Sequence, residues 1–219
     1  MTRAELLQIA KPILFNAEMV QAILDGRKMV TRRAVKHDTE AVLSSAKYRF
    51  DFSDAEIIKI RCQEPYKPGD ILYVRETWQE ASMMSFGEEK THDYIYKADY
   101  DYQSLNSCDD SGEEMLTDFP WCVKWRPSIH MPKEAARIFL RVKSVRVERL
   151  QEITTDEAIK EGIDLEDLKP LGTITHANYV QEFATIWNKT INRENTDLYG
   201  WDANPWVWVI EFERVEVTE

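Results

Sequence analysis

The sequence predicts an α+β protein in which a mixed sheet curves into a small barrel flanked by short helices. The first observation is that several separate segments have strand-like patterns, and the second is that short helical patterns lie between them. The third is the segment 138–150, in which the alternation of apolar residues changes phase near Lys143 and Ser144. Such a change indicates a long strand with a bulge, or two strands that bend around a barrel.

The composition is that of a folded, acidic protein. Of the 219 residues, 43% are hydrophobic and 11% aromatic, which is enough for a packed core. We expect one domain over residues 1–219 with an insertion at about 79–130. The longest apolar run, 206–210, is too short to span a bilayer, and the first residues lack the apolar core of a secretory signal. We therefore expect a cytoplasmic protein with no membrane partner.

The sequence contains no motif for a zinc site or for a glycine-rich phosphate-binding loop. The three cysteines and four histidines are scattered, which argues against a zinc site, and no glycine-rich phosphate-binding motif occurs. We expect neither a metal nor a cofactor. A net charge of -11 argues against coating duplex DNA, but it leaves open the recognition of one nucleoside or one exposed base. The oligomeric state also stays open.

Local signals predict the order of the elements. Residues 12–15 form a short strand, Asn16 caps a helix that Gly26 ends, and an extended segment then runs to Val35. Further strands are predicted at 56–61, 71–78 and 206–212. A capping box formed by Thr154 and Glu157 opens a short helix that ends at Gly162, and 176–190 has the pattern of an amphipathic helix.

The segment 79–130 differs in character from the rest of the chain. Between Asp93 and Asp118 it holds eight acidic residues and one basic residue, so it is either an elaboration of the core or a solvated acidic loop. Its tyrosines predict one strand or hairpin. The loop 121–132, which follows this acidic stretch, is rich in Trp and Pro and contains Trp125, Arg126 and His130. These side chains either line a site or, for the tryptophans, pack into the core.

The stretch 26–33 is the main candidate for a functional site. Five basic residues and no acidic residue lie between Arg27 and Lys36, which on an acidic protein indicates a specific contact. The stretch offers an amine at Lys28 and a hydroxyl at Thr31. In an ideal strand these two side chains point to opposite faces, so they act together only if the backbone bends between them.

Glu161 is a candidate acid because it falls in the last turn of the predicted helix. An ionised carboxylate is disfavoured at that end of the helix dipole. This residue is either a tolerated surface side chain or a carboxyl whose pKa is raised for acid chemistry.

Three landmarks in this order resemble the ASCH family, whose fold is a PUA-like β-barrel. The stretch 26–33, GRKMVTRR, is similar to the family's G-x-K-x-x-[TE]-x-R signature. The stretch 67–72, KPGDIL, is similar to its K-x-G-D turn and strand, and 150–162 matches the segment that places an acidic residue beside the signature. The layout is most similar to the longer ASCH proteins of phages and prophages.

The resemblance implies a chemistry. One bacterial branch of the family hydrolyses the acetyl amide of N(4)-acetylcytidine with a lysine, a threonine and a glutamate. By position, Lys28 resembles the proton acceptor, Thr31 the nucleophile and Glu161 the proton donor. Many members carry glutamate where this chain has Thr31, so the threonine favours the amidohydrolase branch. The chain is about twice the size of the compact amidohydrolases, and its additions could reshape the pocket.

The expected partner is a modified nucleoside or RNA, and three functions stay open. They are an amidohydrolase that acts on an acylated cytidine, a non-catalytic module that binds RNA or a modified base, and an enzyme that cleaves RNA. Arg33 is placed to stabilise an oxyanion or to hold a ribose hydroxyl or a phosphate. The candidate substrate-binding residues are Arg32, Arg33, Glu76, Trp125, Arg126 and His130.

Overall fold

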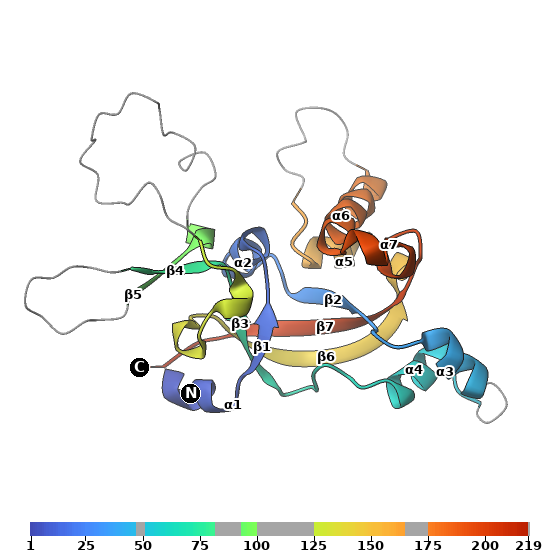
Figure 1. Cartoon of the computed structure of the whole chain (residues 1–219), viewed down its shortest axis with the longest axis horizontal. Helices are drawn as coiled ribbons and strands as arrows, with labels where there is room; N and C mark the ends of the chain where they lie inside the picture. Colours follow the sequence, from blue (N-terminus) through green and yellow to red (C-terminus); the bar gives the residue numbers. More distant parts are fainter. Residues whose placement is uncertain (47–50, 82–92, 100–124, 165–174, 219) are drawn as a thin grey trace, which may run out of the picture. The chain divides into compact units, whose positions relative to one another are not determined.

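The computed structural model describes residues 1–46, 51–81, 93–99, 125–164 and 175–218 (Figure 1). The helices in this part of the chain are α1 (Arg3–Ile9), α2 (Ala17–Leu24), α3 (Thr39–Ala46), α4 (Asp54–Arg61), α5 (Thr155–Lys160), α6 (His176–Thr190) and α7 (Thr196–Tyr199). The strands are β1 (Lys11–Leu14), β2 (Val30–Ala34), β3 (Ile71–Arg75), β4 (Trp78–Ala81), β5 (Asp93–Tyr96), β6 (Phe139–Arg149) and β7 (Trp206–Val215).

The chain forms two compact units. The first consists of Met1–Gln21, Leu72–Phe139 and Glu216–Glu219, and the second of Ala22–Ile71 and Leu140–Val215. The chain passes from one unit to the other within α2, β3 and β6 and at the end of β7. Residues 82–92 and 100–124, which make up most of the predicted insertion at 79–130, lie outside the described residues. The predicted single domain with an insertion therefore stays a prediction.

The strands pair in both directions. Five of them follow the order β1-β3-β6-β7-β2, in which β1 is parallel to β3 and β2 is antiparallel to β7 (Figure 1). Together with the helices, this mixed pairing confirms the α+β class. Within the described residues the sheet is not closed into a barrel. None of the described helices combines the length and the apolar character needed to cross a membrane.

In the first unit, the predicted strand at 71–78 is divided. β3 ends at Arg75, and β4 begins at Trp78 and pairs antiparallel with β5. β5 is the strand that the tyrosines predicted. The rings of Trp78 and Tyr94 meet edge to face across the hairpin, with centroids 5.6 Å apart.

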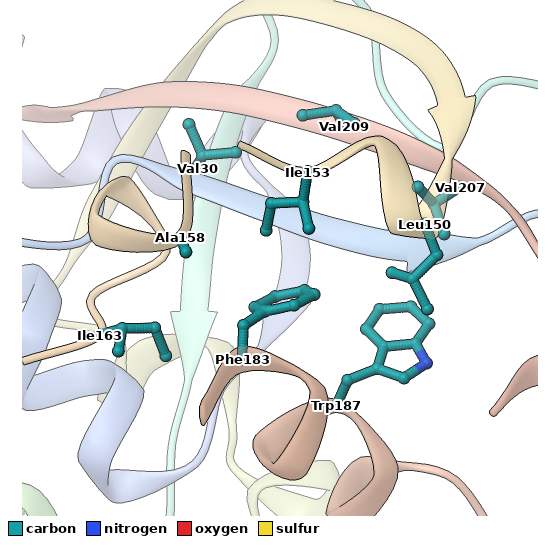
Figure 2. Close-up of a cluster of buried hydrophobic side chains, with 9 residues drawn as sticks. All are labelled: Val30, Leu150, Ile153, Ala158, Ile163, Phe183, Trp187, Val207 and Val209. Atoms are coloured by element: carbon teal, nitrogen blue, oxygen red, sulfur yellow. The ribbon is translucent and has the colours of Figure 1, made fainter. Parts of the chain in front are cut away.

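In the second unit, α6 covers a buried apolar cluster. Figure 2 shows Phe183 and Trp187 of α6 pointing toward side chains of β2 and β7 and of the segment that follows β6. The cluster consists of Val30, Leu150, Ile153, Ala158, Ile163, Phe183, Trp187, Val207 and Val209. The amphipathic helix predicted at 176–190 is confirmed as α6. It packs against β2, the strand that begins two residues after Lys28.

The prediction of a strand at 56–61 is wrong, because these residues belong to α4. Ser53 accepts a hydrogen bond from the Glu56 amide, and the Glu56 side chain accepts one from the Ser53 amide. This capping box begins the helix. Ile57 and Ile58 are buried, whereas Ile60 is 64% exposed. The isoleucines therefore follow a helical face and not a strand alternation.

Candidate functional site

Lys28 lies in a short extended connection between α2 and β2, and its backbone is held from several sides. Gly26, just after α2, has a φ of +75°, the left-handed conformation expected for a glycine that ends a helix. The Lys28 amide donates to the Ala22 carbonyl at 2.9 Å, and the Met29 amide donates to the Lys160 carbonyl at 2.8 Å. The Met29 carbonyl accepts from a β7 amide at 2.9 Å. Three elements thus fix the position of Lys28.

The end of α5 approaches Lys28 closely because a glycine stands there. The predicted capping box opens α5, and Glu161 is its C-cap. Gly162 follows with a φ of +95°. A Cβ at Gly162 would lie 2.9 Å from the Ala22 Cβ and 3.2 Å from the Lys28 Cβ. Any larger residue at this position would therefore push Glu161 and Lys28 apart.

Lys28 and Glu161 form a buried pair. Their backbones face each other in an isolated antiparallel bridge. The Lys28 Nζ donates to Glu161 Oε2 at 2.5 Å and to the Glu161 carbonyl at 2.9 Å. The Lys28 side chain is 1% exposed and the Glu161 side chain 6% exposed. The structure thus brings together two residues that are 133 positions apart in the sequence.

Arg32 of β2, four positions after Lys28, joins this pair. Its fully buried guanidinium donates to Glu161 Oε1 at 3.2 Å. It also donates to Glu148 Oε1 at 2.7 Å and to Glu157 Oε2 at 2.9 Å. The guanidinium lies over the Phe183 ring, 5.7 Å from its centroid. Arg32 therefore links the catalytic candidates to the carboxylates of β6 and α5.

The outer part of this charged cluster was not predicted from the sequence. Arg146 of β6 donates to Glu148 Oε2 at 3.1 Å and also contacts Glu157. Arg146 and Glu148 are two positions apart on a strand, so they lie on one face. The spacing of two residues between Arg146 and Glu148 is the sequence signal that could have predicted this part of the cluster.

The pKa values in the cluster follow from burial and from neighbouring charges. Burial lowers the pKa of Lys28; the Glu161 carboxylate opposes this shift, and the charges of Arg33 and Arg32 add to it. Burial also lowers the pKa of Arg33, while Glu161 and Tyr66 act in the opposite direction. The net effect makes the Lys28 amine easier to deprotonate than an ordinary lysine.

Thr31 and Arg33 belong to β2, in register with Ile210 and Trp208 of β7. Thr31 is buried. Lys28 and Arg32 share the face toward Glu161, and alternation along an extended strand turns Thr31 to the other face. A meeting of the Thr31 hydroxyl with the Lys28 amine stays a prediction.

The remaining predicted residues lie in the first unit. Both oxygens of the buried Glu76 carboxylate accept from Arg137. Arg126 forms a backbone bridge with Trp78, and its guanidinium lies 5.2 Å from the centroid of the Trp78 ring. Trp125 is half-buried, and His130 is exposed. Their role in binding a substrate stays a prediction.

Two further findings concern possible ligands and relatives. Among the described residues, no group of three or more His, Cys, Asp or Glu side chains is arranged to hold a metal ion. No protein-family model and no curated protein matches the chain. A crystal structure of an Enterococcus faecalis V583 protein that carries the family name DUF984 is weakly similar, with a TM-score of 0.38 and 11% identity. The match covers 89% of this chain but only 65% of that one, and no conclusion rests on it.

Proposed function

We propose that the chain is an ASCH-type protein with a PUA-like barrel and that it hydrolyses the acyl amide of an N(4)-acylated cytidine. The observation that carries this proposal is the contact of 2.5 Å between the buried Lys28 Nζ and Glu161 Oε2. Moving one proton across this contact converts an ion pair into a neutral amine and a carboxylic acid. Burial favours the uncharged forms. The pair can therefore present the base and the acid that amide hydrolysis needs.

The first half of the reaction transfers the acyl group to the protein. The neutral Lys28 amine takes the hydroxyl proton of Thr31 while the Thr31 oxygen bonds to the acyl carbon. The bond between the acyl carbon and N4 breaks as Glu161 gives its proton to N4. Cytidine leaves, and an acyl ester remains on Thr31. Lys28 is now an ammonium ion and Glu161 a carboxylate.

The second half restores the starting state. Water attacks the ester carbon and gives a proton to the Glu161 carboxylate. The Thr31 oxygen leaves and takes a proton from the Lys28 ammonium, and the carboxylic acid product departs. In both halves Arg33 supports the oxyanion. The scheme requires the Thr31 hydroxyl to reach the Lys28 amine, so it depends on a bend in the backbone between them.

The test is turnover of N(4)-acetylcytidine by the purified protein, with cytidine and acetate quantified by chromatography. We expect Lys28→Ala to lower kcat/KM by about 100- to 10,000-fold, the range for loss of a general base. Thr31→Val should abolish turnover, since it removes the nucleophile and keeps the shape. Lys189→Ala is the matched control, because it removes one positive charge from an exposed position of α6. Unchanged turnover of N(4)-acetylcytidine by Lys28→Ala would contradict the proposal.

A second candidate is a non-catalytic module that binds a modified base. The strand alternation at Thr31 favours it, because a hydroxyl on the opposite face leaves Lys28 and Glu161 without a nucleophile. In this case the protein would bind RNA that contains the modified cytidine more tightly than unmodified RNA and would release no cytidine. Fluorescence anisotropy with the two RNAs measures the difference.

A further inference from the structure

The two oxygens of the Glu161 carboxylate are divided between two cations. Oε2 accepts from Lys28 at 2.5 Å and Oε1 accepts from Arg32 at 3.2 Å. A buried carboxylate is costly unless a cation or several hydrogen-bond donors accompany it. If Lys28 were the sole cation, loss of its proton would leave Glu161 as an isolated buried anion.

Arg32 is available to Glu161 because other carboxylates near it have a second partner. Glu148 and Glu157 each contact Arg146 as well as Arg32. Arg33 adds a further positive charge that acts on both Lys28 and Glu161. Arg32 therefore remains beside Glu161 as a cation when Lys28 is uncharged.

We infer that Arg32 is a positioning residue that holds Glu161 and carries its countercharge, so that the buried Lys28 amine can be neutral. A guanidinium suits this role because it stays protonated and offers donors in a fixed plane. Arg32 uses them on Glu148, Glu157 and Glu161 at once, with the Phe183 ring beside it. The inference concerns the pair after it has lost its proton, whereas the proposed reaction starts from the pair with one proton, on Glu161. It therefore does not depend on the proposed substrate or reaction.

The experiment is a direct titration of Lys28 by NMR in the whole protein. Lysine labelled with 13C is incorporated, the Lys28 signal is assigned from its loss in Lys28→Met, and its Cε shift is followed with pH. In the unmutated protein Lys28 should titrate below the other lysines. In Arg32→Gln its titration should move to higher pH, because one neighbouring cation is lost and Glu161 then relies on Lys28 alone. Arg146→Gln is the control: it removes a cation that contacts Glu148 and Glu157, and it should move the titration far less.

Each outcome decides the inference. It is overturned if Lys28 titrates with the other lysines in the unmutated protein, if Arg32→Gln leaves the titration in place, or if Arg146→Gln moves it equally. Arg32→Lys is measured in parallel, since it keeps a cation and is the milder change. If Arg32→Gln does not fold, a smaller upward shift in Arg32→Lys supports the inference, because one ammonium cannot hold Glu161 together with Glu148 and Glu157 as the guanidinium does. No shift overturns it. Activity on N(4)-acetylcytidine is not used, so failure of the proposed reaction leaves this result intact.

Discussion

Two buried glutamates, Glu76 in the first unit and Glu161 in the second, are held in different ways. Both oxygens of Glu76 accept from one arginine, Arg137, each at 2.9 Å. Glu161 divides its oxygens between Lys28 and Arg32. An arginine keeps its proton, whereas a buried lysine can lose it. The nature of the partner, more than burial of the carboxylate, therefore separates a fixed ion pair from one that can exchange a proton.

The surroundings of Glu76 fit a structural role. Arg137 also donates to both carboxylate oxygens of Asp99 at 2.8 Å and lies 4.0 Å from the centroid of the Tyr96 ring. The Tyr96 hydroxyl donates to the Ala135 carbonyl at 2.6 Å, and burial raises the pKa of Tyr96 to about 12. Arg137 thus ties the β4–β5 hairpin to the end of β3. The predicted role of Glu76 in binding substrate stays a prediction.

The largest expected effect on stability comes from breaking the Glu76 clamp. Arg137→Met should lower the free energy of unfolding by about 3 kcal/mol, because it leaves Glu76 buried without its cation. We take the lower end of the usual range, since the Arg137 side chain is 27% exposed and water can reach part of the pair. Urea denaturation measures the change.

Arg141→Met is the control for this prediction. It makes the same chemical change in an exposed ion pair, in which Arg141 Nη1 lies 3.6 Å from Glu213 Oε1. This variant should lower the free energy of unfolding by less than about 1 kcal/mol. Similar losses in the two variants would mean that the clamp contributes no more than a surface pair.

A second prediction addresses the approach of α5 to Lys28. Gly162→Ala should lower the free energy of unfolding by about 2–3 kcal/mol. The alanine would be strained in the left-handed conformation, and its Cβ would lie 2.9 Å from the Ala22 Cβ. Gly26→Ala is the matched control, since Gly26 is also left-handed but a Cβ there meets nothing within 4 Å. It should cost about 1 kcal/mol, the strain alone. Equal losses in denaturation curves would show that the close approach is unimportant.

Features that depend on neighbouring residues were predictable from the sequence. Asn16 accepts from the Met19 amide at 2.8 Å and Gly26 has positive φ, as expected for the start and end of α2. Thr154 and Glu157 form the predicted capping box. Caps and left-handed glycines act within a few residues, so their sequence signals are direct. The same kind of signal at Ser53 and Glu56 begins α4, where the alternating isoleucines predicted a strand.

The candidate site depends on contacts that no local pattern contains. Lys28 meets Glu161 across 133 positions, and Arg32 meets Glu148 across 116. Local periodicity states which face a residue lies on, but not which distant residue shares that face. The pairing of Lys28 with Glu161 was expected from the resemblance alone. Nothing in that resemblance pointed to Arg146 or Glu148.

The smallest expected effect is on the pH dependence of stability, where the two glutamate sites should act with opposite sign. Burial raises the pKa of Glu76 above its ordinary value of 4.5, against the pull of Arg137. Between 4.5 and that raised pKa the folded protein binds more protons at this site than the unfolded chain, so stability falls as pH rises. The pKa of Lys28 lies below its ordinary value of 10.5. Between that lowered pKa and 10.5 the unfolded chain binds more protons, so stability rises with pH.

Urea denaturation over a pH series, with one variant for each site, separates the two slopes. Glu76→Gln should remove the fall on the acidic side and leave the alkaline rise in place. Lys28→Met should remove the alkaline rise and leave the fall on the acidic side in place, because it deletes the amine whose proton the folded state holds less tightly. If Lys28→Met left the alkaline rise unchanged, the folded protein would hold the Lys28 proton as firmly as the unfolded chain does. The contrast between a fixed pair and an exchanging pair would then be lost.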